Sequence, residues 1–193
     1  MPGRPMRSPG VWSELNQHEL GLLLRQLDLH EGIAPAALPD WVSRVEEIAL
    51  QQQGEWLVVA QSPLPVVQHL LETCARHCAK LDDPGWRRDD LVIGDFGPHN
   101  VLLDDQGQIV AVFDLDGAGR GDRVIDLVGL LYMVEPPLLQ TVRHAARQIA
   151  SPPALRTCGV YWIVHRLYQG IMANSENLAP IAQRMLAHVD LLI

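Results

Sequence analysis

The sequence predicts an α+β protein that is mainly helical and carries one small β-hairpin. Amphipathic stretches with helical spacing cover most of the 193 residues, and short β-branched runs bounded by turn residues occur only near the middle of the chain. A chain of this length fits one compact domain. The strands are therefore expected to form a small element within a helical protein.

The N-terminal half is expected to be an extended segment followed by helices. Residues 1–10 are rich in proline and glycine and are typical of a linker. Apolar residues then recur at helical spacing up to about His30, with Ser13 and Asn16 as a weak cap signal. Two further helices are expected, over Pro39 to Gln53 and, as a long core helix, over Pro63 to Leu81.

The strands are expected between these helices and a second helical region. They cover Leu91 to Ile93, Val101 to Leu103 and Ile109 to Phe113, and a turn at Asp104 to Gly107 joins the last two into a hairpin. The helices expected after them are Arg123 to Met133, Pro137 to Ala150, Pro153 to Ala173 and Ala179 to Leu192.

Composition excludes several functional classes. The formal net charge of −8 argues against binding to nucleic acid or to an anionic membrane, both of which require clustered Lys and Arg. The three cysteines lack the spacing of a disulfide framework, so reduced thiols are expected. Neither a signal peptide nor a membrane span is evident. We therefore expect a soluble, cytoplasmic protein with no membrane partner.

Three polar side chains of the central segment have the spacing that phosphoryl transfer requires. Asp95 follows the first strand, Asn100 lies five residues later, and Asp114 ends the hairpin. This reaction needs a carboxylate that orients the attacking hydroxyl and oxygen ligands that hold Mg²⁺ on the phosphates. Asp116 would point the same way as Asp114 on an extended strand and is a candidate second ligand.

The string Asp95-Phe96-Gly97 also matches the D-F-G of protein kinases, in which the Asp binds metal. That assignment would need an Asp-x4-Asn loop some 15 to 20 residues upstream, and the sequence has none. Asp95 is instead predicted to be the Asp of the catalytic loop, with Asn100 and Asp114 as the metal residues.

Structural interpretations remain open beside the functional ones. Asp and Asn residues often form turns and caps around a hairpin. Asp122 and Asp126 are better explained as a helix cap and a buried, hydrogen-bonded carboxylate. His99 could contact phosphate, although loop histidines usually face solvent. The Cys74, His77 and Cys78 group is better explained by core thiols than by a metal site, because no fourth ligand is evident.

The central motif resembles the aminoglycoside phosphotransferase and choline kinase-like family of small-molecule kinases. That family has a loop H-G-D-x-x-x-x-N and a metal segment [IF]-D-[WF]-[DE], which read IGDFGPHN (Ile93 to Asn100) and FDLD (Phe113 to Asp116) in this chain. The run GAGRGDRVIDL (Gly117 to Leu127) resembles the segment that follows the metal site.

The resemblance implies a protein-kinase-like C-terminal lobe with the cofactors Mg²⁺ and ATP or GTP. It implies that Asp95 is the catalytic residue, contacting the hydroxyl of a small-molecule acceptor, and that Asn100 and Asp114 bind Mg²⁺. The acidic surplus of the chain would favour a cationic acceptor, although it could equally be an ordinary soluble surface. The motif does not identify the acceptor.

Two departures from the family pattern affect the expected activity. Ile93 occupies the usual position of the motif His. No Gly-rich loop or strand Lys precedes Leu91, and the single lysine, Lys80, lies on a predicted helix.

We therefore expect residues 1–10 to be a hinge-like segment and residues 11–193 to be a C-terminal lobe without its N-terminal nucleotide lobe. The isolated chain should then show no measurable phosphorylation of a hydroxyl acceptor. The alternatives are a non-catalytic binding or scaffold remnant, and a half-enzyme that associates with a partner through the surface an N-terminal lobe would face.

Overall fold

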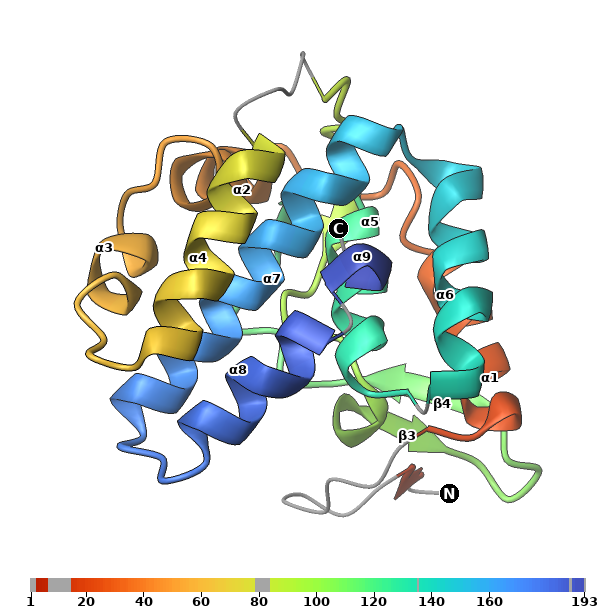
Figure 1. Cartoon of the computed structure of the whole chain (residues 1–193). Helices are drawn as coiled ribbons and strands as arrows, with labels where there is room; N and C mark the ends of the chain where they lie inside the picture. Colours follow the sequence, from red (N-terminus) through yellow and green to blue (C-terminus); the bar gives the residue numbers. More distant parts are fainter. Residues whose placement is uncertain (1–2, 7–14, 79–83, 135, 188, 193) are drawn as a thin grey trace. The chain divides into compact units, whose positions relative to one another are not determined.

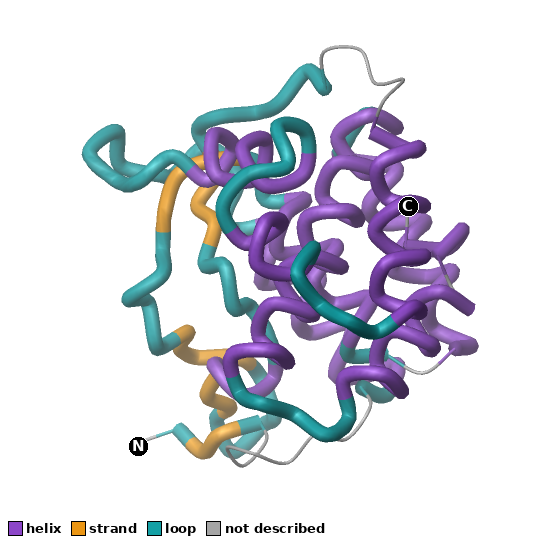
Figure 2. Tube along the Cα trace, turned by 60° about the vertical axis from the view of Figure 1, so that its left-hand side comes forward, coloured by secondary structure: helices purple, strands orange, loops and turns teal. Residues whose placement is uncertain are grey.

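The structure is a computed structural model that describes residues 3–6, 15–78, 84–134, 136–187 and 189–192. The chain divides into two compact units, Met1–Trp41 with Arg87–Gln148 and Val42–Trp86 with Ile149–Ile193. Figure 1 shows the elements along the chain, and Figure 2 distinguishes strands from helices. Mixed helices and small antiparallel sheets confirm the predicted α+β class.

The first unit contains the strands of the described chain. They are β1 (Arg4–Pro5), β2 (Asp90–Val92), β3 (Val101–Leu103), β4 (Ile109–Val112) and β5 (Gly119–Gly121). Its helical segments are α1 (Gln17–Asp28), η1 (Pro98–Asn100), α5 (Val124–Gly129), η2 (Leu130–Tyr132) and α6 (Pro136–Ile149), the last of which belongs to this unit up to Gln148.

The strands form two small antiparallel sheets. One sheet has the order β1-β3-β4 and contains the predicted hairpin, with Val101 opposite Val112. The other pairs β2 with β5. Neither β1 nor β5 was predicted. Their sequences, Arg-Pro and Gly-Arg-Gly, lack the alternation of strand-forming residues, so each is a strand only because a partner supplies hydrogen bonds.

The predicted N-terminal helix is confirmed, and Asn16 of the predicted cap signal is its N-cap. The side chain of Asn16 accepts a hydrogen bond from the backbone N–H of Glu19, and the carboxylate of Glu19 accepts one from the backbone N–H of Asn16. This reciprocal pair is a capping box. Ser13 lies outside the described residues.

The second unit is helical. It contains most of α2 (Trp41–Ala49) together with α3 (Glu55–Val59), α4 (Pro65–Cys78), α7 (Pro152–Met172), α8 (Leu178–Ala187) and α9 (Val189–Leu192). The apolar helix α7 is its centre, and α3, α4, α8 and α9 pack against it. Figure 1 shows α4 and α8 beside α7.

One helix of this unit was not predicted. It is α3, whose sequence Glu-Trp-Leu-Val-Val favours a strand; burial of Trp56 and Val59 in a unit centred on α7 accounts for the helix. The last expected helix is observed as α8 and α9, and the residue between them, 188, lies outside the described residues. The long core helix is observed as α4, and residues 79–81 of its expected range, with Lys80, lie outside the described residues.

No helix in the described part of the chain combines the length and apolar character needed to cross a bilayer.

Candidate active site

The loop that carries Asp95 lies between β2 and β3 in the first unit. The side chains of Ile93 and Phe96 are buried on either side of Asp95, and Phe96 makes an edge-on contact with the ring of His30 at 5.4 Å between centroids. The side chain of Asp95 is 59% exposed. Two buried apolar anchors therefore present one carboxylate to solvent.

The carboxylate of Asp126 binds the backbone of this loop. It is fully buried and accepts hydrogen bonds from the backbone N–H groups of Ile93 at 2.7 Å and Gly94 at 2.8 Å. Burial raises the pKa of Asp126 to about 7, although the two N–H bonds oppose this shift. These bonds involve the backbone of Ile93, so the loop has an anchor at this position without the histidine that is usual there. The prediction that Asp126 is a buried, hydrogen-bonded carboxylate is confirmed.

Trp41 supports the same loop from another direction. Gly94 has a φ of +84°, and a Cβ atom added there would overlap the indole ring of Trp41. The indole N–H donates a hydrogen bond to the carbonyl of Gly117 at 2.9 Å. Glycine is therefore favoured at position 94 for two reasons: it adopts the left-handed backbone conformation easily, and it lets the indole ring of Trp41 approach the backbone closely. The side chain of Trp41 therefore contacts both Gly94, which precedes Asp95, and Gly117, which follows Asp116.

His99 lies beside the predicted catalytic residue. Its Nε2 is 3.1 Å from Oδ2 of Asp95, and its side chain is only 26% exposed. His99 is therefore partly exposed and also in contact with Asp95. The sequence signal for this contact is the spacing of four residues between them, which ends in the short helix η1.

Asn100 connects the loop to the hairpin. Its side chain is buried, and Nδ2 donates a hydrogen bond to the backbone carbonyl of Asp95 at 3.0 Å. Its own carbonyl accepts a hydrogen bond from the N–H of Phe113, also at 3.0 Å. The structure therefore brings Asn100 into contact with Asp95 and with the residue that precedes Asp114.

Asp114 lies immediately beyond β4, exposed and in a left-handed backbone conformation with a φ of 59°. Aspartate tolerates this region better than most residues. The chain therefore bends at Asp114 and places Asp116 in a turn. The prediction that Asp114 and Asp116 point the same way along an extended strand is wrong for this reason.

Other candidate ligands have structural roles. Asp122 accepts a hydrogen bond from the N–H of Val124 at 3.0 Å, as expected of a helix cap, and burial raises its pKa. Burial also raises the pKa of the Cys74 thiol above its usual range and that of Cys78 to about 12. Within the described ranges, no three His, Cys, Asp or Glu side chains are grouped as metal ligands.

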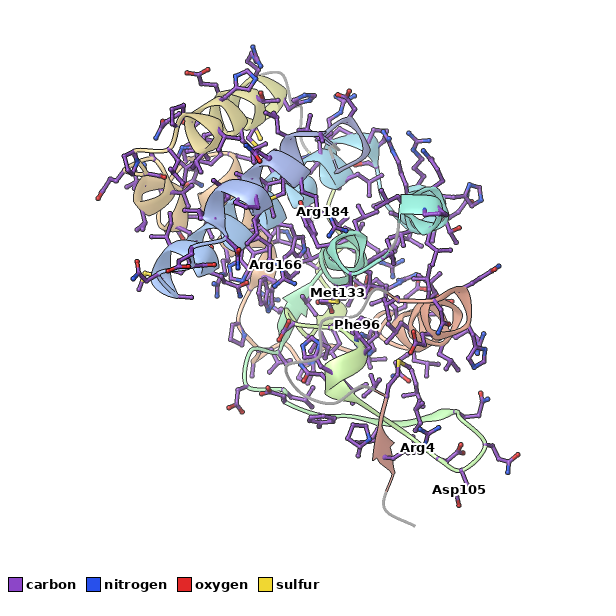
Figure 3. The ribbon with its side chains drawn as sticks, turned by 60° about the horizontal axis from the view of Figure 1, so that its bottom comes forward. Arg4, Phe96, Asp105, Met133, Arg166 and Arg184 are labelled. Atoms are coloured by element: carbon purple, nitrogen blue, oxygen red, sulfur yellow. The ribbon has the colours of Figure 1, made fainter. Side chains whose placement is uncertain are left out.

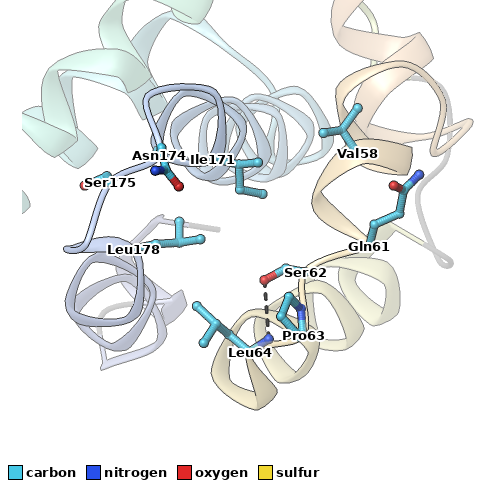
Figure 4. A pocket seen from close by; sticks show the side chains of 10 residues that line it. Val58, Gln61, Ser62, Pro63, Leu64, Ile171, Asn174, Ser175 and Leu178 are labelled. Carbon is cyan, nitrogen blue, oxygen red and sulfur yellow. Dashed lines mark hydrogen bonds between the residues drawn. The ribbon is translucent and has the colours of Figure 1, made fainter.

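A pocket in the second unit offers no competing chemistry. It has a volume of about 340 Å³ and lies between the α3–α4 loop and the α7–α8 turn (Figure 4). Its lining residues are Val58, Gln61, Ser62, Pro63, Leu64, Gly170, Ile171, Asn174, Ser175 and Leu178. None of them is charged, so this pocket lacks a carboxylate that could act as a base or bind a metal.

The comparison with family models places the chain in a class of phosphotransferases. The model described as the phosphotransferase enzyme family, APH, matches residues 4–158. The chain belongs to this family. No sequence among the curated proteins matches it.

Solved structures show the same fold at low sequence identity. A thermostable mutant of aminoglycoside phosphotransferase APH(4)-Ia, in a ternary complex with ADP and hygromycin B, has a TM-score of 0.64 and 20% identity, with coverage of 98% of this chain and 69% of that one. The GDP complex of aminoglycoside 2′-phosphotransferase-IIIa has a TM-score of 0.59 and 13% identity, with coverage of 99% and 66%. Choline kinase LicA from Streptococcus pneumoniae has a TM-score of 0.51 and 15% identity, with coverage of 91% and 64%.

Proposed function

We propose that this chain is the part of a kinase that, together with an N-terminal lobe, transfers a phosphoryl group from ATP or GTP to a hydroxyl group of a small molecule. The observation that carries the proposal is the hydrogen-bonded unit in which Asn100 joins the backbone of Asp95 to the strand end before Asp114. Phosphoryl transfer depends mainly on such positioning of an acceptor and a metal ion. Membership of the phosphotransferase family supports the reaction class, and the nucleotides held by two similar structures support the donor.

In this proposal each site residue has a separate role. Asp95 is the catalytic residue that accepts a hydrogen bond from the acceptor hydroxyl and orients its oxygen towards the phosphate. The side-chain oxygens of Asn100 and Asp114 would hold Mg²⁺. Asp116, which is exposed in the turn two residues after Asp114, would be a second carboxylate ligand. When bound, Mg²⁺ would neutralise charge on the phosphate oxygens.

The donor set fits this ion. The hydrogen bond from Nδ2 of Asn100 to Asp95 leaves the amide oxygen on the opposite side of the group. Asp114 is exposed, so water has access to its carboxylate. Mg²⁺ prefers oxygen ligands and retains several waters, and it is usually held by one or two carboxylates.

We further propose that residues 11–193 form the C-terminal lobe of such a kinase and that residues 1–10 are a hinge-like segment. Pairing of Arg4–Pro5 with β3 and the start of the family match at residue 4 support a close association of this segment with the lobe. Residues 7–14 lie outside the described part. A complex with hygromycin B and a choline kinase among the similar structures support a polar or cationic small-molecule acceptor.

A thermal-shift titration with Mg²⁺ and ATP or GTP tests the metal assignment. A ligand present at one hundred times its Kd stabilises by about 2.7 kcal/mol, which for a chain of this size raises Tm by roughly 5 to 10 °C. We expect a shift of this order for the wild type and a much smaller one for Asp114→Ala, because a principal carboxylate ligand is lost.

The matched control is Asp105→Ala. Asp105 is an exposed residue at the tip of the hairpin, away from Phe96 of the catalytic loop (Figure 3). The control should respond like the wild type. Equal shifts for the wild type and Asp114→Ala would contradict the metal assignment.

A further inference from the structure

The contact between His99 and Asp95 suggests a role for His99 that the family motif does not specify. The motif leaves this position open, as one of its four unspecified residues. In the structure, Nε2 of His99 is 3.1 Å from Oδ2 of Asp95. The contact closes a loop of four residues, so the imidazole lies beside the carboxylate that the proposed reaction uses.

The packing around His99 explains why the ring is in this place. A Cβ atom added to Gly97 would be 2.9 Å from Cε1 of His99 and 3.0 Å from the sulfur of Met133. The missing side chain at position 97 therefore leaves room that the imidazole and the methionine fill from two sides. Packing of this kind restricts the ring to few orientations.

The contact with His99 involves a carboxylate that lies largely in solvent. The side chain of Asp95 is 59% exposed and lies between the buried side chains of Ile93 and Phe96. A hydrogen bond to one carboxylate oxygen fixes the direction of the second oxygen as well, because the group is planar. Hydrogen bonds to an ionised acceptor are stronger than those between neutral groups.

We propose that His99 is a positioning residue for Asp95: its Nε2–H donates a hydrogen bond to Oδ2 and holds the carboxylate in one orientation towards the acceptor hydroxyl. The catalytic meaning of this orientation rests on the function proposed above. The geometric role of His99 does not, and it is measured without metal, nucleotide or acceptor.

The test is an NMR measurement of the Asp95 side chain in the uniformly ¹³C- and ¹⁵N-labelled 193-residue protein. Three-bond couplings from Cγ of Asp95 to its backbone nitrogen and carbonyl carbon report the χ1 rotamer. We expect single-rotamer couplings in the wild type and averaged couplings in His99→Leu, which keeps bulk but removes the donor. His99→Gln should restore the single-rotamer values, because its terminal amide places an N–H close to the position of Nε2.

His18→Leu is the matched control, since His18 is an exposed histidine on α1. It should leave the Asp95 couplings at their wild-type values. Unchanged couplings in His99→Leu would overturn the proposal, as would averaged couplings in the wild type. If His99→Leu does not fold, the imidazole ¹⁵N shifts of the wild type still decide: in the singly protonated ring the proton should be on Nε2, and a proton on Nδ1 would overturn the donor assignment.

These results are separable from those of the Mg²⁺ titration. Equal Tm shifts for wild type and Asp114→Ala, together with restored couplings in His99→Gln, would contradict the proposed function but support the positioning role of His99. A smaller Tm shift for Asp114→Ala, together with couplings that do not change when His99 is replaced, would support the proposed function but contradict the positioning role. If both succeed and turnover of an acceptor is measured, His99→Leu should lower kcat by roughly tenfold to a hundredfold with little change in KM, because orientation affects the transition state more than binding.

Discussion

At the scale of single residues, two polar side chains support the site by binding the backbone of its loop, in addition to the side-chain contact between His99 and Asp95. Asp126 accepts two loop N–H groups, and Asn100 bonds the carbonyl of Asp95. Backbone partners fix the path of the chain without restricting the neighbouring side chains. Asp95 can therefore lie in an exposed position on a loop whose backbone is held firmly.

The raised pKa of Asp126 predicts a specific dependence of stability on pH. An acid that is harder to ionise in the folded state binds its proton more tightly there. Its contribution to the free energy of unfolding is therefore greatest below the unfolded pKa of about 3.8 and declines as pH rises to about 7. In Asp126→Asn this decline should be absent, and the amide protons of Ile93 and Gly94 should lose protection from hydrogen exchange.

Urea unfolding between pH 5 and 8 measures the first effect as the difference between wild type and variant. Asp105→Asn, at the exposed hairpin tip, is the control and should not alter the pH profile. A wild-type to Asp126→Asn difference that is constant with pH would contradict the prediction.

At the scale of elements, short segments are stabilised by contacts with other elements. Helix α3 has only five residues, too few to be stable alone. Glu55 at its start contacts Nδ1 of His165 in α7 at 2.8 Å and Nη2 of Arg44 in α2 at 2.8 Å. One carboxylate thus connects three helices of the second unit.

Glu55→Gln should destabilise the second unit at neutral pH. Burial opposes ionisation of Glu55, but the hydrogen bonds and charges of His165 and Arg44 outweigh it and keep the pKa below its ordinary value of 4.5. The stabilisation is therefore present above the unfolded pKa and is lost as pH falls through the lower folded value. We expect a loss of about 1–3 kcal/mol at pH 7, shrinking in acid, from chemical unfolding followed by circular dichroism.

The matched control is Glu47→Gln. Glu47 is an exposed residue of α2, and the change there should alter stability by less than about 0.5 kcal/mol. Equal effects of the two substitutions would show that the Glu55 contacts contribute nothing specific.

At the scale of the whole molecule, ion pairs between distant parts of the sequence stabilise the first unit. The side chain of Asp90 has no solvent exposure and contacts Nη1 of Arg123 at 3.3 Å, while Nη2 of Arg123 contacts Glu31 at 2.9 Å. Asp90 also accepts a hydrogen bond from the N–H of Gly32 at 2.9 Å. The end of α1, the start of β2 and the start of α5 are joined in this way.

Arg123→Met should destabilise the protein by about 3 kcal/mol, the lower end of the range for breaking a buried ion pair. It removes one of the two guanidinium groups that lie 3.3 Å from the buried carboxylate of Asp90, and the other, that of Arg87, remains. Differential scanning calorimetry would show the loss as a lower Tm. Arg25→Met, on an exposed part of α1, removes the same charge and should change Tm little. A similar small change for Arg123→Met would contradict a stabilising role for this ion pair.

Local patterns predicted much of the fold and of the site. The spacing of Asp95 and Asn100 was readable because both lie in one loop, and five residues limit their separation to about 18 Å. The predicted hairpin brings the residue before Asp114 to Asn100, since the N–H of Phe113 donates a hydrogen bond to the backbone carbonyl of Asn100. The hairpin and the long helices were readable for the same reason: the periodicity of 2 or 3.6 residues is set by the backbone itself. The family assignment, which the family match bears out, also came from this segment.

The tertiary structure decided the features in which local preference is weak or misleading. Strands β1 and β5 and helix α3 form because distant parts of the chain pair with them or pack on them. A segment of two to five residues is too short to show a periodicity that would predict its secondary structure. Asp116 does not continue the direction of β4, because the chain bends at Asp114. The ring of His99 lies beside Asp95 because the absence of a side chain at Gly97 leaves space there, which His99 and Met133 fill.

The sequence by itself determined the family and the link between Asp95 and Asn100, since five residues of chain limit the separation of the two. Only the tertiary structure decided how they are held. The supports of the site, Asp126 and Trp41, lie 31 residues after and 54 residues before Asp95 in the sequence, and only packing of the folded chain brings such distant residues against one loop.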